Sequence, residues 1–460
     1  MFTPDTYKKR RDELRKILTG GIIFFPGNDE APFNYPANTY LYRQDSTFMY
    51  YFGLQEPGLA AVMDLDDGSE CLFGNDCTMS DIIWMGQQPS MRDKAASIMM
   101  EKTKPYTDLA GVLQKAQQKG RTIHFLPPYR AETKIQILDI LGILPAKQKE
   151  CASVPLIKAV VKMRMEKEPQ EIKQIEMAIE TSYLMHTYVM KHARAGMLES
   201  ELAGAIEGIA LANGGTISFP VILSISGQIL HNHYHGNSLC DGRLIITDAG
   251  AETAMGYAGD ITRTVPVSGK FDTLQKAIYK TVLQANLKGI EMSHAGVYYR
   301  DVHLAAARVI ADGLKDIGLM RGNMEDAVAQ GAHTLFFPHG LGHAMGLDVH
   351  DMEGFGENYV GYDDTITRSK EFGLSSVRFG RRIEPGFVLT VEPGIYFIPA
   401  LIDQWEGEKK LAEFIDYESL KAYRSFGGVR IEDDILITEN GCKVLGRPVP
   451  KTVEEIEGMR

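Results

Sequence analysis

The sequence predicts an α/β protein of two domains, in which an N-terminal α/β domain precedes a larger domain that contains a sheet flanked by helices. The chain has 460 residues, more than the roughly 100–200 residues of a typical domain. Short apolar runs alternate with helix-like segments in the first third, and strand-like segments dominate after Thr216. We therefore expect an N-terminal domain at residues 1–155, a linker at 156–168 and a second domain at 169–460.

The first domain is expected to alternate strands and helices. Two apolar runs that end in turn-forming residues predict strands at Gly21–Phe25 and Leu59–Leu65. Helix-like spacing of apolar residues predicts helices at Tyr7–Leu18, Ala95–Glu101 and Asp108–Lys119. This alternation is typical of an α/β domain.

The second domain is expected to begin with a long helix. After the basic stretch Leu156–Lys167, Pro169 lies in a first helical turn, where a missing N–H is tolerated, so a helix is predicted at Gln170–Ala193. β-Branched, partly alternating runs predict strands at Ile217–Ser224, Arg243–Thr247, Phe387–Val391 and Val429–Thr438. Two further helices are predicted between these strands, at Leu274–Met292 and Asp301–Leu314.

The composition excludes several classes of protein. There are 49 Lys and Arg against 60 Asp and Glu, a net charge of −11, which argues against a generic nucleic-acid binder. No stretch approaches the ~20 apolar residues of a membrane-spanning helix, and the N-terminus lacks an apolar signal region. The five scattered cysteines contain no Cys-x-x-Cys pair, so we expect a reducing, cytoplasmic location.

Common catalytic motifs are absent, which directs attention to acids and histidines in the strands of the second domain. The sequence has no Gly-x-Ser-x-Gly elbow, no P-loop and no His-Glu-x-x-His pair. Asp248 and Asp260 flank a turn rich in Gly and Ala, so a strand–turn–strand would bring their carboxylates to one end of a hairpin. Either aspartate taken alone is more often a residue that caps a turn than a functional one.

Further candidates follow in three later segments. His339, His343 and His350 lie within twelve residues, and it is improbable that all three are only satisfied polar groups of a loop. Glu392 lies in a strand that is apolar on both faces, where an unpaired carboxylate is costly and a metal ion would satisfy it. Period 2 places Arg430, Glu432 and Asp434 on one face of a strand, and such a charged row is usually solvent-exposed.

Four carboxylates and one imidazole indicate a hydrolase with two metal ions. These ligand types suit a hard or borderline divalent ion such as Mn²⁺ better than a closed zinc site. Shared carboxylates could hold two ions ~3.5–4 Å apart, which would lower the pKa of a bridging water from roughly 15.7 towards about 7 and polarise a carbonyl. The predicted chemistry is attack of a metal-bridged hydroxide on that carbonyl.

Together these residues resemble the pita-bread metallopeptidases of the aminopeptidase P and prolidase branch, nearly end to end. Tyr42-Arg-Gln-Asp-Ser-Thr-Phe48 and Gly53-Leu-Gln-Glu-Pro57 are similar to the N-terminal signature of that branch. The five metal-ligand positions of the family fall, in order, on Asp248, Asp260, His343, Glu392 and Glu432. The resemblance implies a C-terminal pita-bread (creatinase/aminopeptidase-like) α+β domain and two divalent ions per chain, with Mn²⁺ as the expected ion.

The resemblance also implies a role for each ligand. Asp260 and Glu432 would bridge the two ions, and Asp248 would bind one of them. His343 and Glu392 would bind the other ion. Glu392 would also transfer protons to and from the attacking water.

Four residues outside the ligand set would act on the substrate. His231 matches a substrate-binding histidine of the family. His350 and Arg430 match an outer pair that stabilises the tetrahedral intermediate or positions the substrate. Arg378 matches the arginine that binds the free carboxylate of a dipeptide in prolidases, although Arg381 or Arg382 could replace it. His339 matches a motif position that is not a ligand.

The implied reaction is hydrolysis of the bond between an N-terminal residue and proline, in di- or oligopeptides. The nitrogen of such a bond has no N–H and its proline has a fixed φ, so a shaped pocket is required. Dipeptidases (prolidases) accept only Xaa-Pro, whereas aminopeptidases release the first residue of longer chains, and the sequence leaves these two activities nearly even. The stretch Phe372–Arg460 is closer to prolidases.

Two departures and two alternatives accompany this prediction. The spacing from Asp248 to Asp260 is one residue longer than is usual in the family, so the turn must absorb an insertion. His231, His233 and His235 could form a separate, adventitious metal site. A non-catalytic pita-bread interaction module and a metal-free creatinase-like hydrolase are both disfavoured by the complete ligand set. The family further implies a homodimer or higher homo-oligomer. The acidic composition and the lack of a long apolar stretch predict no nucleic-acid or membrane partner.

Overall fold

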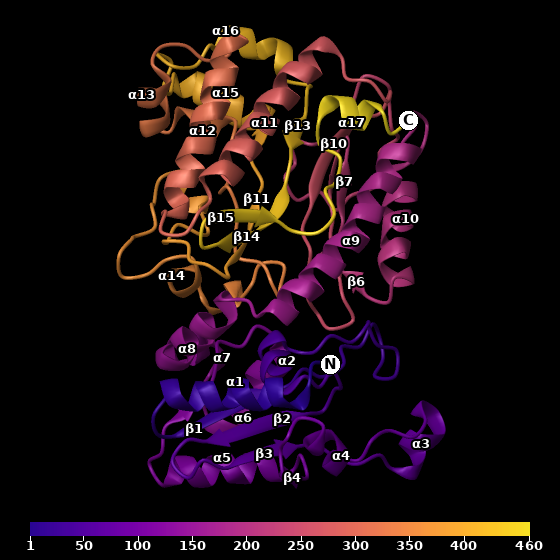
Figure 1. The fold of residues 1–460 in the computed structure, drawn as a ribbon, viewed down its shortest axis with the longest axis vertical. Coiled ribbons are helices and arrows are strands. Elements are labelled where there is room, and N and C mark those ends of the chain that lie inside the picture. The colour runs from indigo at the N-terminus through magenta and orange to yellow at the C-terminus, as the bar shows by residue number, and fades with distance from the viewer. The chain divides into compact units, whose positions relative to one another are not determined.

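The structure is a computed structural model that describes residues 1–460, and the chain divides into two compact units (Figure 1). The first unit contains Met1–Arg164 and Gly354–Tyr359, and the second contains Met165–Glu353 and Val360–Arg460. No helix in either unit combines the length and apolar character that crossing a membrane requires.

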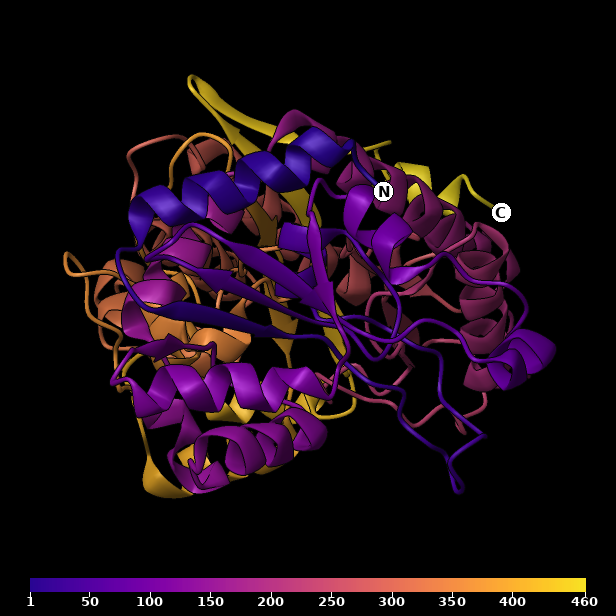
Figure 2. The same ribbon diagram turned by 90° about the horizontal axis from the view of Figure 1, so that it is seen from below.

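The first unit is built around a five-stranded sheet with the order β4-β3-β2-β1-β5. Its strands are β1 (Ile22–Pro26), β2 (Ala60–Asp64), β3 (Glu70–Phe73), β4 (Lys102–Lys104) and β5 (Ile123–His124). Its helices are α1 (Pro4–Ile17), α2 (Ser46–Phe52), α3 (Met79–Met85), α4 (Met91–Ala96), α5 (Asp108–Gln118), α6 (Ala131–Leu141), α7 (Pro145–Cys151) and α8 (Val154–Met165). Helix α1 lies on one side of the sheet and α5 on the other (Figure 2), so the unit is a layered α/β structure.

Most predicted elements of the first unit are confirmed. The helices predicted at Tyr7–Leu18 and Asp108–Lys119 correspond to α1 and α5, and both predicted strands form. The helix predicted at Ala95–Glu101 is wrong, because α4 ends at Ala96 and the chain then turns through Met99, at φ 56°, into β4. The apolar residues that suggested a helix lie instead in a turn that leads into β4, the edge strand that pairs with β3.

The stretch 156–168, predicted as a linker, is largely helical. It falls within α8 up to Met165. Leu156, Ile157 and Val160 of this helix are buried, which gives the helix an apolar face. The basic character of this stretch predicts a linker, whereas its apolar residues form one face of an amphipathic helix.

The second unit contains ten short strands and two long helix pairs. The strands are β6 (Thr216–Ile217), β7 (Ile222–Ser224), β8 (Leu244–Asp248), β9 (Ala251–Glu252), β10 (Thr262–Pro266), β11 (Val388–Val391), β12 (Gly394–Tyr396), β13 (Gly428–Arg430), β14 (Asp433–Thr438) and β15 (Gly441–Val444). The helices are α9 (Pro169–His192), α10 (Glu199–Ala212), α11 (Thr273–Met292), α12 (Tyr299–Asp316), α13 (Met324–Ala329), α15 (Pro399–Glu408), α16 (Tyr417–Leu420) and α17 (Val453–Glu457). Helix α14 (Glu357–Val360) belongs mostly to the first unit, which includes Gly354–Tyr359.

The helix pairs flank the strands of the second unit. Helix α9 packs beside α10, α11 packs beside α12, and the strands lie between the two pairs (Figure 1). The strands form two three-stranded sheets, β10-β8-β7 and β11-β14-β15, and two pairs, β12-β13 and β6-β9. Ile246 of β8, Val282 of α11 and Val391 of β11 are examples of its buried core. The predicted arrangement of a sheet flanked by helices is therefore confirmed, although the sheet is divided.

Two predicted strands are each interrupted. The run Ile217–Ser224 forms β6 and β7 with irregular backbone between them. The run Val429–Thr438 forms β13 and β14, because β13 pairs with β12 whereas β14 pairs with β11. The chain changes partner at Ile431 and Glu432, and the functional side chains gather near this point.

Candidate metal centre and active site

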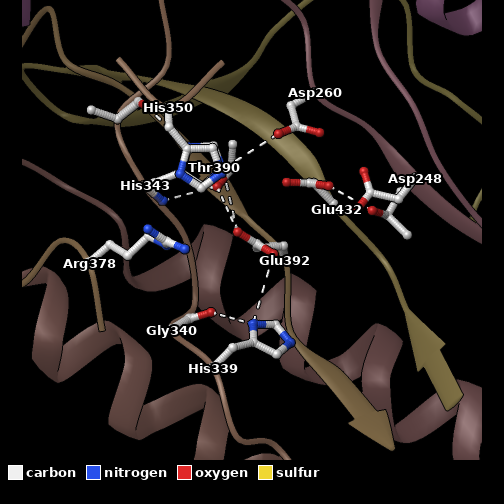
Figure 3. A network of polar contacts seen from close by, with 12 residues as sticks. Asp248, Asp260, His339, Gly340, His343, His350, Arg378, Thr390, Glu392 and Glu432 are labelled. Carbon is white, nitrogen blue, oxygen red and sulfur yellow. Dashed lines mark hydrogen bonds and ion pairs between the residues drawn. The ribbon is translucent and has the colours of Figure 1, made fainter. Parts of the chain in front are cut away.

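A pocket of about 590 Å³ in the second unit is lined by every residue that the sequence predicts for the site. Figure 3 shows the polar contacts among most of these residues. These residues are His231, Asp248, Asp260, His343, His350, Arg378, Glu392, Arg430 and Glu432. His339 lines the pocket as well, whereas Arg381 and Arg382 do not. Arg378 is therefore the arginine of its cluster that faces the pocket.

Strands β8 and β10 place two carboxylates at one end of their antiparallel pairing, as predicted. Thr262 of β10 lies opposite Asp248 of β8, and Asp260 precedes β10 by two residues. Asp248 Oδ2 accepts a hydrogen bond from Arg430 Nη2 (2.7 Å), and the Asp260 N–H donates to Asp434 Oδ2 (3.0 Å). The Oδ1 atoms of Asp248 and Asp260 are buried and have no hydrogen-bond partner. Each aspartate thus keeps one oxygen available for a cation.

The His343 ring presents a lone pair to two carboxylates. The backbone of His343 is held against β11, because its N–H donates to Thr390 Oγ1 (3.1 Å). Nδ1 lies 3.1 Å from the Ala344 carbonyl, which can only accept, so Nδ1 carries the proton. Nε2 then lies 3.5 Å from Asp260 Oδ2 and 3.6 Å from Glu392 Oε1. Burial lowers the pKa of His343, which favours this neutral form.

Glu432 lies in the turn where the chain passes from β13 to β14. The Thr262 hydroxyl donates to Glu432 Oε2 (2.7 Å), and the Glu432 N–H donates to the Thr262 carbonyl (3.0 Å). Asp260, His343 and Glu432 each offer a ligand atom, and these three atoms lie within 4.8 Å of one another. All three residues are buried, so their geometry fits a bound metal ion.

The electrostatics of the site favour a cation. Burial, reinforced by neighbouring carboxylates, raises the pKa of Asp260 and Glu432 well above their usual range. Burial also raises the pKa of Glu392 to about 6. Carboxylates this close cannot all ionise unless positive charge compensates them. Oxygen donors with a single imidazole are the ligand set of hard or borderline divalent ions, so the residues fit the predicted metal centre.

A buried chain of hydrogen bonds lies next to the candidate metal ligands and orients Arg430. Arg430 donates from Nη1 to the Tyr396 hydroxyl (2.8 Å) and from Nε to Thr262 Oγ1 (3.2 Å). His339 Nδ1 donates to the Gly340 carbonyl (2.8 Å), so His339 Nε2 accepts from the Tyr396 hydroxyl (2.9 Å). Burial lowers the pKa of His339 to about 3. Arg430 is thereby fixed against Asp248.

The side chains of His350, Glu353 and Arg378 are each about a third exposed. The His350 ring stacks on the His343 ring, with centroids 3.7 Å apart and an interplanar angle of 13°. Glu353 Oε2 lies 2.5 Å from His350 Nδ1, and the same carboxylate forms an ion pair with Arg378. Desolvation by the surrounding protein lowers the pKa of His231, a solvent-exposed residue that lines the pocket.

The other two histidines of the 231–235 segment lie apart from the metal group. The Val221 carbonyl is 3.5 Å from His233 Nδ1 and 3.1 Å from His235 Nε2. His233 lines the pocket, but neither histidine belongs to the group of three ligands that the structure assembles.

Sequence reasoning missed several residues that organise this site. The expected exposure of the charged row is wrong, since Arg430, Glu432 and Asp434 are 3%, 1% and 0% exposed. The hydroxyls of Thr262 and Tyr396 carry no sequence signal, because their partners lie far away in the chain. Asp434 is named in the charged row but without a role at the site, and Glu353, three residues after His350, could have been noticed from its spacing.

Comparison with known proteins places the chain in a family. Residues 7–124 match the aminopeptidase P, N-terminal domain, and residues 173–439 match metallopeptidase family M24. The Xaa-Pro dipeptidase of Homo sapiens is 32% identical over 458 residues, which cover 97% of this chain and 90% of that protein. The Xaa-Pro aminopeptidase of Escherichia coli (strain K12) is 31% identical over 470 residues, which cover 98% and 97%.

Solved structures agree with these sequence matches. Proline aminopeptidase P II from Yersinia pestis covers 100% of this chain and 99% of its own, with a TM-score of 0.81 and 30% sequence identity. This confirms the predicted fold class, an N-terminal α/β domain followed by a pita-bread domain. The chain belongs to metallopeptidase family M24, in its aminopeptidase P and prolidase branch.

Proposed function

We propose that the chain is an Xaa-Pro metallopeptidase, which hydrolyses the peptide bond between an N-terminal residue and proline in the pocket of the second unit. The observation that carries this function is the convergence of Asp260, His343 and Glu432 on one point of that pocket, with buried carboxylate oxygens that no protein donor satisfies. Relatives named as Xaa-Pro dipeptidase and Xaa-Pro aminopeptidase, both aligned over nearly the whole chain, support the same reaction.

The proposed centre holds two divalent ions, with Mn²⁺ as the preferred metal. Asp248 would bind one ion, His343 and Glu392 the other, and Asp260 and Glu432 would bridge them. The fit of the ligand types and the unsatisfied Oδ1 atoms of both aspartates support this assignment. Bound divalent ions would supply a water of lowered pKa and would polarise the scissile carbonyl.

The protein's own groups would manage protons and orientation. Glu392, whose pKa burial raises to about 6, can accept a proton and return it near neutral pH. Arg430 would keep Asp248 in place through its 2.7 Å hydrogen bond. His231 and His350 line the same pocket as the ligands, where they would bind the substrate and stabilise charge that develops on its carbonyl oxygen.

The pocket is suited to a bond that lacks an N–H. A proline substrate needs no hydrogen-bond acceptor for its nitrogen but needs a shaped wall for its ring. The pocket also has an apolar part of its lining, which consists of Phe219, Pro220 and Ile222. Both Xaa-Pro dipeptides and longer Xaa-Pro peptides are proposed substrates. A cytoplasmic location and a homo-oligomeric state are further proposals from the sequence.

The function is tested with purified chain that is stripped of metal, reloaded with Mn²⁺ and supplied with Ala-Pro and Ala-Pro-Pro. Cleavage of the Ala–Pro bond, absent in the stripped chain and restored with about two ions per chain by elemental analysis, is the expected result. Ala-Ala-Pro is the matched control, since its first bond has an N–H. Equal activity of the stripped chain, or no cleavage with any divalent ion, would overturn the proposal.

A further inference from the structure

One carboxylate beside the pocket, that of Glu353, contacts two residues that line the pocket. Glu353 follows His350 by three residues, and its N–H donates to the His350 carbonyl (3.3 Å). Its Oε2 lies 2.5 Å from His350 Nδ1, while its Oε1 accepts from Arg378 Nη1. Figure 3 shows Arg378 and His350 on the same side of the site. The three side chains are each about a third exposed, and two of them, His350 and Arg378, line the pocket.

Arg378 is the more exposed of the two arginines that line the pocket. The other lining arginine, Arg430, is buried and donates to Asp248, Tyr396 and Thr262. A free carboxylate directly after proline would need a guanidinium of this kind. Glu353 already neutralises Arg378, so an arriving carboxylate meets an ion pair and a like charge beside it.

We propose that Glu353 determines the substrate preference of the enzyme, by occupying Arg378 and thereby disfavouring peptides that end in a carboxylate directly after proline. A neutral peptide group at that position suffers no repulsion from Glu353, so the preferred substrates continue beyond proline. Specificity then depends on a repulsive element rather than on an added attraction. This inference rests on the proposed function.

Glu353 is a positioning residue, because it acts through Arg378 and also contacts His350. The His350 ring stacks on His343, so a substitution of Glu353 could change overall turnover through the metal centre. A test of specificity must therefore compare two substrates that differ only in terminal charge. Ala-Pro and its neutral amide, Ala-Pro-NH₂, have the same scissile bond and meet this requirement.

The test measures the ratio of kcat/KM for Ala-Pro to kcat/KM for Ala-Pro-NH₂ in Mn²⁺-loaded variants. Glu353→Gln is expected to raise this ratio about tenfold, mainly through a lower KM for Ala-Pro, because the charge that competes for Arg378 is removed. The double variant Glu353→Gln with Arg378→Ala is expected to lose this gain. Glu384→Gln is the matched control: its carboxylate lies 3.7 Å from Arg381, outside the pocket, and the ratio stays within about twofold of the unchanged chain.

A ratio that stays constant or falls in Glu353→Gln would overturn the inference, and so would a gain that survives in the double variant. A second measurement avoids turnover by using Glu392→Gln, which lacks the proposed proton-transfer group. Calorimetry gives the Kd of Ala-Pro and of Ala-Pro-NH₂ for Glu392→Gln alone and for Glu392→Gln combined with Glu353→Gln. The Kd for Ala-Pro should fall by a similar factor relative to that for the amide. If the unchanged chain cleaves neither peptide, the proposed function fails, while the binding ratio still decides whether Glu353 excludes a carboxylate.

Discussion

At the scale of single residues, the site is defined by lone pairs that the protein leaves unsatisfied. The Oδ1 atoms of Asp248 and Asp260 are buried without a donor, and His343 Nε2 faces two carboxylates. Burial of a charged oxygen without a partner is costly, so such an arrangement is stable only with protons or cations. These are also the residues that the sequence identifies, because acids and histidines in apolar strands violate the ordinary pattern.

Replacement of His343 by alanine is expected to remove metal and activity together. His343 supplies the nitrogen of the three-residue group, and its loss leaves only oxygen ligands whose pKa values are raised. Elemental analysis and kcat/KM on Ala-Pro should fall in parallel. His192→Ala, on an exposed histidine of α9, is the control that changes neither. A variant with full activity and no metal would refute the ligand assignment.

Replacement of His350 by alanine is expected to separate binding of metal from turnover. His350 stacks on His343 but is not in the group of converging ligand atoms. We expect metal content close to that of the unchanged chain and a kcat/KM lower by about one to three orders of magnitude, as for a group that acts on the transition state. Loss of metal in this variant would instead make His350 a ligand.

The hydroxyl groups that orient the charged residues of the site could not be predicted from the sequence. Thr262 is hydrogen-bonded to Glu432, 170 residues away, and Tyr396 to His339, 57 residues away. A threonine or tyrosine in a β-branched run is ordinary in sequence, because strands favour these residues. Only the tertiary pairing shows that they orient charged neighbours. Glu353 differs, since its contact with His350 is local and could have been anticipated from the spacing.

At the scale of elements, the site depends on short strands that exchange partners. Strand β13 pairs with β12 and strand β14 with β11, and Glu432 occupies the point of exchange. The sequence predicts one continuous strand there, because β-branched residues continue across Ile431. Long helices such as α11 and α12 are predicted well, since their periodicity is local. The interruption of a strand depends on which distant strands lie beside it, and no local pattern records that.

Removal of the Arg263 side chain is expected to destabilise this exchange point. Arg263 of β10 donates to the carbonyls of Glu432 (2.5 Å) and Val449 (3.0 Å) and forms an ion pair with Asp433 (2.7 Å). Lys451 also pairs with Asp433. Arg263→Ala would leave Asp433 buried with only this second partner, so we expect the free energy of unfolding to fall by about 3–5 kcal/mol in urea titrations.

An exposed ion pair provides the control for Arg263. Arg447 lies 3.4 Å from Glu180, and both side chains are about half exposed. Arg447→Ala should change the free energy of unfolding by less than about 0.5 kcal/mol. If the two variants were equally stable, the buried network would contribute nothing to holding β10 against the turn at Glu432.

At the scale of the whole molecule, folding and metal binding are coupled through charge. The chain carries a net charge of −11, and its second unit buries the side chains of Asp260 and Glu432 in one pocket, beside Asp248 and Glu392. A fold that concentrates like charges in its core is stabilised by any cation that binds the folded state alone. The sequence predicts that acidic residues gather at a metal site in the second domain. It does not show how deeply these residues are buried, and this burial determines how strongly folding is coupled to metal binding.

The stabilisation of the chain by metal should therefore increase as pH rises. In the metal-free folded chain the pKa of Glu392 is raised from 4.5 to about 6, and those of Asp260 and Glu432 are raised further above their usual range. The folded state then binds more protons than the unfolded state, so these groups lower the stability of the metal-free chain as pH rises above about 4.5. Metal binds the deprotonated carboxylates and offsets this loss.

Calorimetry of EDTA-treated and Mn²⁺-loaded chain should show a gap in Tm that widens from about pH 5 to about pH 7. His343→Ala should show little gap at either pH, and a gap that narrows with rising pH in the unchanged chain would mean that the buried carboxylates are not the groups that bind the metal.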